Sequence, residues 1–429
     1  MKYGLIVFKE TGNLGDDILS YSARRFLPSL DYIIDREELD TFVPDKKEFV
    51  SVIFNGWYLY LKFNWPPSPY LLPYFTGVHF TENDFLGIQD EYLQGEGKSY
   101  LDTYSPIGCR DKHTVSLLRK HDINAYFSGC LTLTINPFSD IQKSNEIYLV
   151  DVPSRVEEKI NYLVFKDKEL KKESHNINKD CRNKSWKERE TLVEDYLKKY
   201  QRASCVITTR LHAALPCLAM GTPVLLIHKD DKDYQDRIST YEDYLWHCSE
   251  EDYLNGKVNF DINNPPKNKD NYKDLRHKLI KSVNENILKV KTNLFDLEGL
   301  PDPEVFSNIW CERIKWQKDL LRDKRWLLVD QLEEQVRWGK ELIKSQEWLK
   351  EQNENLNCRI EELKSWIKQL EDGKAFLESE KLRLQIEIDE IKNSLNKTNK
   401  EYMKMREKYD KLTKDYFIDK LIKIRRLDK

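Results

Sequence analysis

The first 300 residues alternate between short apolar runs, typical of buried strands, and segments whose apolar residues recur at helical spacing. The first set of predicted elements comprises strands at 3–8, 50–54, 105–109 and 125–127 and helices at 17–26 and 112–121. The second set comprises strands at 147–152, 205–208 and 223–227, helices at 185–200 and 213–220, and a polar loop at 166–184. Strands that alternate with helices predict parallel sheets. We therefore expect an α/β fold in two halves, with the boundary near 140–145 and a ligand site between them.

The pattern changes after residue 310. From Leu356 to Tyr416 apolar residues recur at alternating spacings of four and three, and the same rule holds upstream with a phase slip near 346–349. Lys374, Lys381 and Thr398 are polar positions of this seam. We expect a long coiled coil with a parallel homodimer as its simplest form, and a single charged helix is the alternative.

Charge separates the same two regions. Residues 311–429 contain 29 basic and 25 acidic residues and no proline, whereas residues 1–310 carry a net charge of −7. A mildly acidic globular part argues against nucleic-acid binding. No run approaches the ~20 apolar residues of a membrane-spanning helix. We expect a cytoplasmic protein whose basic end, 421–429, contacts anionic lipid at most peripherally.

The eight cysteines show no paired spacing, so neither a disulfide framework nor a zinc site is expected, and no other metal-ligand cluster is visible. Cys205 and Cys217 lie in apolar runs, which suits buried, reduced thiols. Cys130 has no base beside it in the sequence that would activate it as a nucleophile.

The strongest candidate chemistry lies at Thr209-Arg210-Leu211-His212, between an apolar strand and an apolar helix. A guanidinium and the free N–H groups of a helix N-terminus form an anion site, and an imidazole exchanges protons near neutral pH. The structural alternative is that Arg210 pairs with a carboxylate and that His212 caps or packs.

Three further strand ends carry candidate residues. Gly12-Asn13-Leu14-Gly15-Asp16 follows the first strand, and its two glycines permit close backbone approach to a ligand. Arg110 precedes Asp111, which we expect to cap a helix, and Arg110 taken alone is expected to be exposed. Ser128-Gly129 ends the strand at 125–127 and is expected to line the site.

Together these segments resemble the polysaccharide pyruvyl transferase family, over roughly residues 1–290. The matching segments are Gly12-Asn13-x-Gly15-Asp16, Arg110-Asp111-x-x-Thr114, residues 126–134, residues 208–213 and Gly221-Thr222-Pro223. Their order and spacing agree with the family as well as their identity.

The resemblance implies two Rossmann-like domains, as in glycosyltransferases of the B type. It also implies transfer of pyruvate from phosphoenolpyruvate to a sugar as a ketal, with release of phosphate and without a further cofactor. Arg210 then binds the phosphoenolpyruvate anion and His212 acts as general acid. Substrate contacts are expected from Gly12, Asn13, Gly15, Asp16, Arg110, Ser128, Gly129 and Thr209, with Asp16 or Asp17 as acceptor of a hydroxyl proton.

The expected organisation is a first Rossmann-like domain at 1–142, a second at 143–296, a linker at 297–310, the coiled coil at 311–420 and a basic tail at 421–429. The expected partners are a saccharide acceptor, free or lipid-linked, and further copies of the chain joined through the coiled coil. Two alternatives stay open. A nucleotide-sugar glycosyltransferase has only the spacing of Glu242 and Glu250 in its favour. A non-catalytic scaffold would be excluded by full activity of a chain without 311–429.

Overall fold

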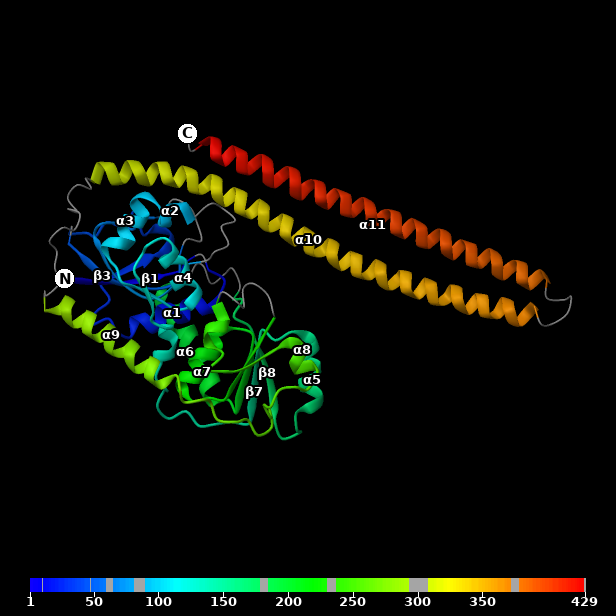
Figure 1. The fold of residues 1–429 in the computed structure, drawn as a ribbon, viewed down its shortest axis with the longest axis horizontal. Coiled ribbons are helices and arrows are strands. Elements are labelled where there is room, and N and C mark those ends of the chain that lie inside the picture. Colours follow the sequence, from blue (N-terminus) through cyan, green and yellow to red (C-terminus); the bar gives the residue numbers. More distant parts are fainter. Residues whose placement is uncertain are drawn as a thin grey trace. The chain divides into compact units, whose positions relative to one another are not determined.

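Two parallel β-sheets form the framework of the first of two units, Met1–Lys315, and two long helices form the second, Trp316–Lys429 (Figure 1). The computed structural model describes every residue except 10, 47, 59–64, 81–88, 178–183, 230–236, 293–307, 372–377 and 428–429. For 90–91, 308–330, 333, 368–371, 378–381 and 413–427 it describes the backbone alone. The expected linker and the side chains of the expected basic tail therefore lie almost wholly outside the described residues.

The first sheet has six parallel strands in the order β2-β1-β3-β4-β5-β6. They are β1 (Lys2–Val7), β2 (Tyr32–Asp35), β3 (Val50–Trp57), β4 (Leu71–His79), β5 (Ile107–Cys109) and β6 (Ala125–Phe127). Their residues are buried almost throughout, as expected for a parallel sheet covered on both faces. The sequence analysis missed β2 and β4.

The second sheet has five parallel strands in the order β11-β10-β9-β7-β8. They are β7 (Glu146–Val150), β8 (Glu169–Glu173), β9 (Cys205–Thr208), β10 (Val224–His228) and β11 (Trp246–Ser249). The expected loop at 166–184 was wrong in part, because β8 lies within it. The sequence of β8, Glu-Leu-Lys-Lys-Glu, is that of a charged edge strand, and it is only partly buried. The two sheets confirm the expected α/β class.

The strand order reverses once in each sheet. After β1 the chain adds β2 on one side and then β3 on the other, and after β7 it adds β8 and then β9 in the same way. Open parallel sheets bind ligands outside the carboxyl ends of the strands at such a reversal. The segments that follow β1, β7 and β9 are therefore the first places to search for a site.

Helices from both halves share one hydrophobic core. The helices of this unit are α1 (Leu14–Arg24), α2 (Gln89–Leu93), α3 (Gly95–Thr103), α4 (Lys112–Lys120), α5 (Ser154–Leu163), α6 (Trp186–Arg202), α7 (Leu211–Met220), α8 (Glu250–Leu254) and α9 (Lys273–Lys291). Buried apolar residues of α1, α6, α7 and α9 belong to a single cluster. Asp111 caps α4 as expected, and Gly221 ends α7 with φ +79°.

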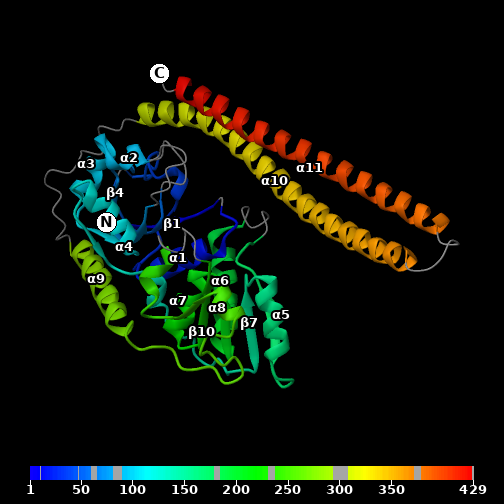
Figure 2. The ribbon, with the colours of Figure 1, turned by 45° about the vertical axis from the view of Figure 1, so that its right-hand side comes forward.

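Helix α9 returns from the second half to the first (Figure 2). Arg276 donates from Nη1 to the carbonyl oxygen of Leu133 at 2.6 Å, and Ser282 is hydrogen-bonded to Tyr74 beside the first sheet. The two halves are thus joined by a common core and by this helix.

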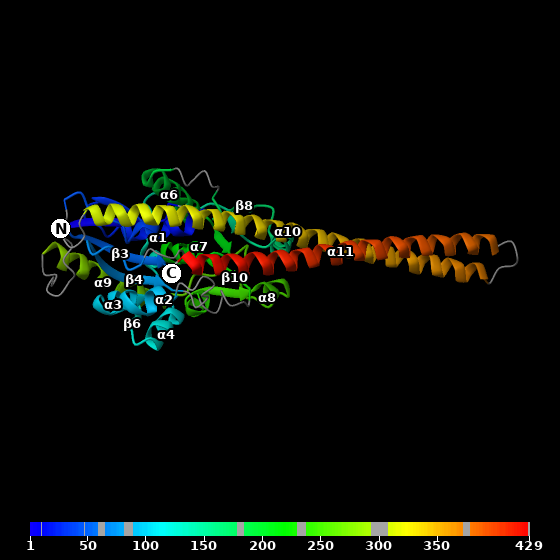
Figure 3. The same cartoon turned by 90° about the horizontal axis from the view of Figure 1, so that it is seen from above.

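In the second unit, α10 (Asn308–Glu371) and α11 (Glu378–Leu427) run antiparallel and side by side (Figure 3). Ile360 and Leu363 of α10 and Leu384 and Ile388 of α11 form one buried cluster. The seam of α11 packs on α10 of the same chain, and the expected coiled coil between copies of the chain stays a prediction. A heptad identifies the apolar face of a helix, but not the chain that covers it.

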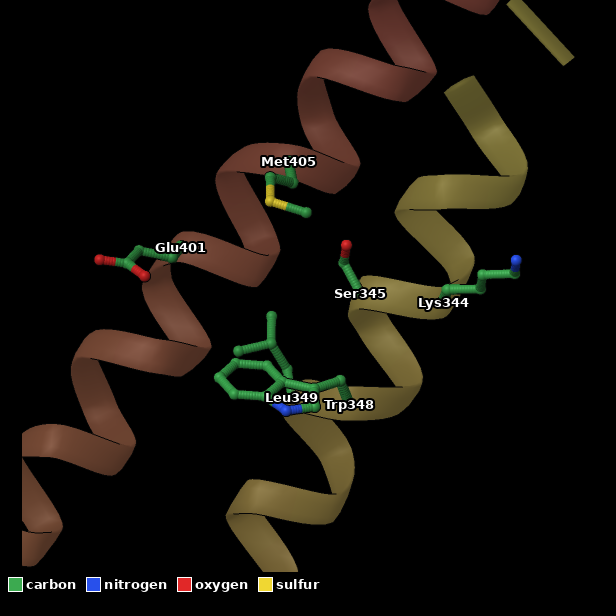
Figure 4. A pocket seen from close by; sticks show the side chains of 6 residues that line it. All are labelled: Lys344, Ser345, Trp348, Leu349, Glu401 and Met405. Carbon is green, nitrogen blue, oxygen red and sulfur yellow. The ribbon is translucent and has the colours of Figure 1, made fainter. Parts of the chain in front are cut away.

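Polar pairs interrupt this seam further along both helices. Gln346 donates to Tyr402 at 2.6 Å, and Asn353 donates to Asn399 at 2.7 Å. A groove of about 400 Å³ lies between the helices, lined by Lys344, Ser345, Trp348, Leu349, Glu401 and Met405. Figure 4 shows Leu349 and Met405 directed between the helices, whereas Lys344 and Glu401 extend away. In the part of the chain that the structure describes, no helix is both long and apolar enough to cross a bilayer.

Candidate active site

Arg210 lies at the reversal of the second sheet, where it follows β9 and forms the N-cap of α7. Its Nε donates to Oδ2 of Asp151 at 2.6 Å, and its Nη2 donates to Oδ1 of Asn176 at 3.2 Å. Asp151 directly follows β7, the neighbouring strand. The side chain of Arg210 remains 34% exposed. The carboxylate therefore orients a guanidinium that still has solvent-accessible surface for an anion.

His212 lies in the first turn of α7 and meets Arg110 from the other half of the unit. Its Nε2 is 3.4 Å from Nη1 of Arg110, which directly follows β5. Arg110 is 1% exposed, so the expectation that it is exposed was wrong. Because a guanidinium only donates, Nε2 of His212 is the acceptor and the neutral imidazole carries its proton on Nδ1. The hydroxyl of Tyr241 donates to the backbone oxygen of Arg110 at 2.5 Å and fixes this strand end.

Gly15 permits the close approach of α1 to this imidazole. A Cβ at Gly15 would lie 3.0 Å from Nδ1 of His212, which is closer than a side chain tolerates without a shift of its neighbour. The glycine that the sequence marked for a ligand therefore first makes room for His212.

The loop after β1 is bound to the segment after β8. Ile177 donates to the carbonyl oxygen of Gly12, and the N–H of Leu14 donates to the carbonyl oxygen of His175, both at 2.8 Å. Asn13 accepts from the N–H of Gly15 and so caps α1. Asp16 accepts from the hydroxyl of Thr11 at 2.6 Å. These contacts hold the loop in place, and substrate binding by Gly12, Asn13 and Asp16 remains a prediction.

Asp17 belongs to the interior and not to the site. Its side chain is fully buried and pairs with Nη2 of Arg189 of α6 at 2.7 Å. Burial raises the pKa of Asp17 to about 7, against the opposing effect of Arg189. The expectation that Asp17 accepts a hydroxyl proton was wrong, because both of its carboxylate oxygens are buried and the side chain is paired with Arg189 in the core.

Ser128, Gly129 and Thr209 lie at the strand ends that the sequence indicated, where they brace the backbone. The Ser128 hydroxyl accepts from the N–H of Gly77 at 2.8 Å and donates to the carbonyl oxygen of Cys109 at 3.0 Å, so it joins β4, β5 and β6. Gly129 has φ +84°, which favours glycine. The hydroxyl of Thr209 donates to the backbone oxygen of Asp151 at 2.9 Å. Their contacts with substrate remain predictions.

Three cationic or titratable groups near His212 were missed by the sequence analysis: His79, His175 and Arg237. Arg237 depresses the pKa of His212 through its charge, and His175 and His79 do so when they are protonated. His79 is the last residue of β4, so the signal that marked Arg210, a polar residue at the end of an apolar strand, applies to it as well. It was missed because β4 itself was missed.

Burial and neighbouring charges shift the titration of the histidines in this cluster. Burial, and then the charges of Arg110 and Arg237, hold the pKa of His212 well below its usual range, so its imidazole is neutral in the absence of ligand. Burial also lowers the pKa of His175 to about 4, and its Nε2 is 2.8 Å from the hydroxyl of Tyr200.

Other chemistries find less support among the described residues. No group of three His, Cys, Asp or Glu side chains is arranged there to hold a metal ion. Cys205 and Cys217 are buried free thiols, as expected. Burial raises the pKa of Cys130, which argues against a thiolate nucleophile. The groove between α10 and α11 lacks a comparable cluster of cations.

Comparison with known proteins agrees with the site. The family model described as polysaccharide pyruvyl transferase matches residues 13–228, half of the chain. No curated protein matches. A crystal structure of the functionally uncharacterized protein KP1_0663 from Klebsiella pneumoniae is similar, with 13% identity over 57% of this chain and 92% of that chain. Its TM-score of 0.33 supports no inference. The family match spans α1, Arg110, Ser128 and the Arg210–His212 turn, and this chain belongs to the polysaccharide pyruvyl transferase family.

Proposed function

We propose that this protein transfers pyruvate from phosphoenolpyruvate to a saccharide and releases phosphate. The observation that carries the proposal is the meeting of Arg110 and His212, 3.4 Å apart, at strand ends of the two halves. Arg210 lies two residues from His212 and offers a second guanidinium. Phosphoenolpyruvate carries a phosphate and a carboxylate, which are the two anionic groups that such cations bind.

The reaction needs a proton at the methylene carbon of phosphoenolpyruvate. We assign its delivery to His212, whose pKa is held low by burial and by Arg110 and Arg237 and rises when a bound anion offsets these two charges. Protonation leaves a positive centre at C2, to which a first sugar hydroxyl adds. The bond between C2 and the phosphate oxygen then breaks and phosphate leaves. A second sugar hydroxyl adds to C2 and closes the ketal. General acid catalysis of this kind contributes roughly 10²–10⁴-fold in rate.

Phosphate release tests this proposal. The full chain is incubated with phosphoenolpyruvate and a panel of methyl glycosides and β-linked oligosaccharides, and phosphate and ketal product are measured. We expect turnover with at least one acceptor and a loss of about 10²–10⁴-fold in kcat for His212→Ala. His277→Ala is the control, because His277 is exposed on α9 and lies outside the cluster.

Failure of every acceptor would contradict the proposal, and so would unchanged turnover in His212→Ala. Binding of a nucleotide sugar without turnover of phosphoenolpyruvate would instead favour the glycosyltransferase alternative. This proposal includes four further expectations. They are Rossmann-like domains of the glycosyltransferase-B type, an acceptor that is either free or lipid-linked, self-association through α10 and α11, and a cytoplasmic location.

A further inference from the structure

A second histidine lies beside the Arg110–His212 pair, held by a buried carboxylate. Nδ1 of His79 is 2.7 Å from Oδ2 of Asp111, and the two side chains are 2% and 0% exposed. Val78 of β4 pairs with Cys109 of β5, so His79 ends β4 beside Arg110, and Asp111 follows one residue later as the N-cap of α4. His79 is thus fixed by the end of β4, and Asp111 by the start of α4.

The contacts of Asp111 define the tautomer of His79. One carboxylate oxygen of Asp111 accepts from the N–H of Thr114 at 2.7 Å and caps α4. Burial by itself would raise the pKa of Asp111, but the hydrogen bond and charge of His79 and the charge of Arg110 hold it below its usual range. An ionised carboxylate accepts the proton on Nδ1 of His79, so Nε2 carries the free lone pair. The same division of roles orients the general base of hydrolases that use an Asp–His pair.

His79 is also neutral at the pH where the reaction must run. Burial lowers its pKa to about 4, helped by Arg110 and Arg237 and opposed by Asp111. Arg110 connects this pair to His212, because its Nε lies 3.8 Å from Oδ2 of Asp111 and its Nη1 lies 3.4 Å from Nε2 of His212. The buried guanidinium of Arg110 therefore contacts His212 directly and is linked to His79 through Asp111.

A helix cap alone does not account for this arrangement. The cap of α4 uses one oxygen of Asp111, and the other oxygen is given to an imidazole at the end of the adjacent strand. Thr114 also holds the ring, with Oγ1 at 3.2 Å from Nδ1. The ring is thus fixed at its Nδ1 edge by two side chains, and its Nε2 edge is left for another partner.

We propose that His79 is the general base that takes the proton of the first acceptor hydroxyl, with Asp111 as its positioning residue. This rests on the proposed function. With phosphoenolpyruvate bound, the anion offsets Arg110 and Arg237 and His212 starts the cycle protonated. As the hydroxyl oxygen bonds to C2 of phosphoenolpyruvate, its proton passes to Nε2 of His79 while the His212 imidazolium delivers its proton to the methylene carbon. When the C2–O bond to phosphate breaks, His79 returns its proton to the phosphate. His212 takes the proton of the second hydroxyl, so both histidines regain their starting state.

Chemical rescue tests this assignment in the full chain, with the acceptor that gives wild-type turnover. We expect His79→Gln to keep the KM for phosphoenolpyruvate and to lose about 10²–10⁴-fold in kcat. His79→Ala should lose kcat to a similar extent and regain part of it when free imidazole is added. His175→Ala is the matched control, since His175 is equally buried but should show no imidazole-dependent recovery.

Wild-type kcat in His79→Gln would overturn the assignment. So would a folded His79→Ala, checked by circular dichroism, whose loss imidazole does not reverse, because His79 would then only position its neighbours. Nitrogen NMR of the wild-type chain gives a readout that needs no turnover. An Nδ1–H tautomer of His79 is expected, and an Nε2–H tautomer overturns the assignment even where phosphoenolpyruvate is not a substrate. The proposed function itself fails separately, when the wild type releases no phosphate.

Discussion

At the scale of single residues, the site is a group of buried imidazoles kept neutral by their surroundings. His79 and His175 have a pKa of about 4, chiefly because burial disfavours their charged forms. His212 is depressed by burial and by its cationic neighbours. Neutral rings of this kind can exchange protons with a substrate without carrying fixed charge of their own. They also tie the stability of the fold to pH.

His175 allows this link to be measured away from the proposed chemistry. In the unfolded chain its pKa returns to about 6.5, so between about pH 6.5 and 4 the unfolded state binds a proton that the folded state does not. The free energy of unfolding therefore falls as pH drops through this window, by up to about 1.4 kcal/mol per pH unit from His175. Asp151 and Arg210 are the charged groups that act on it.

We predict that His175→Gln reduces this dependence. Glutamine does not titrate and can still hydrogen-bond to the hydroxyl of Tyr200. The measurement is urea unfolding of wild type and variant at several pH values between about 7 and 5. A variant that loses stability with acid as steeply as the wild type would contradict the low pKa of His175.

At the scale of elements, α1 and α6 are joined by a buried ion pair. Asp17 and Arg189 are 0% and 2% exposed at their side chains, and they connect the helix after β1 with the helix before β9. Arg189 also donates to the carbonyl oxygen of Lys9 at 3.3 Å. Removing one partner leaves the other charge buried and unpaired, which destabilises the fold. Replacing both residues with apolar ones removes this desolvation cost.

We predict that Arg189→Met lowers the free energy of unfolding by about 3–5 kcal/mol and that Asp17→Leu in the same chain recovers most of it. Lys98→Met is the control, because Lys98 pairs with Asp102 on the surface of α3 and should cost below about 1 kcal/mol. Denaturant unfolding monitored by circular dichroism measures all four chains. A double variant no more stable than Arg189→Met would show that the pair is needed for more than charge balance.

Some strands and site residues could be predicted from the sequence, and others could not. Strands such as β1 and β9 were predictable because they are apolar throughout, and Arg210 and His212 stood out because they interrupt such sequence. β8 was not predictable, since a charged edge strand has the composition of a loop. The nearness of His79 to Arg110 was not predictable either. It depends on β4 lying beside β5, which only long-range strand pairing determines.

At the scale of the whole molecule, the chain combines an α/β unit that contains Arg110, Arg210 and His212 with a second unit of two long helices packed side by side. The heptad pattern of the second unit is equally compatible with a hairpin and with helices from two chains, because both cover the same apolar stripe. The polar pairs Gln346–Tyr402 and Asn353–Asn399 fix one register between α10 and α11. This register gives a distance that can be measured in solution.

We predict a short distance between spin labels at Lys344 and Glu401, which line the same groove of the hairpin. One continuous helix would separate these positions by about 85 Å, at 1.5 Å per residue. The labels are introduced as cysteines after Cys181, Cys311 and Cys358 are changed to serine, and labelled protein is diluted with unlabelled protein to suppress distances between chains. A short distance that survives dilution requires that α11 fold back on α10 within one chain. A distance near 85 Å, or a short one that disappears on dilution, would mean that the apolar seam is instead covered by a second copy.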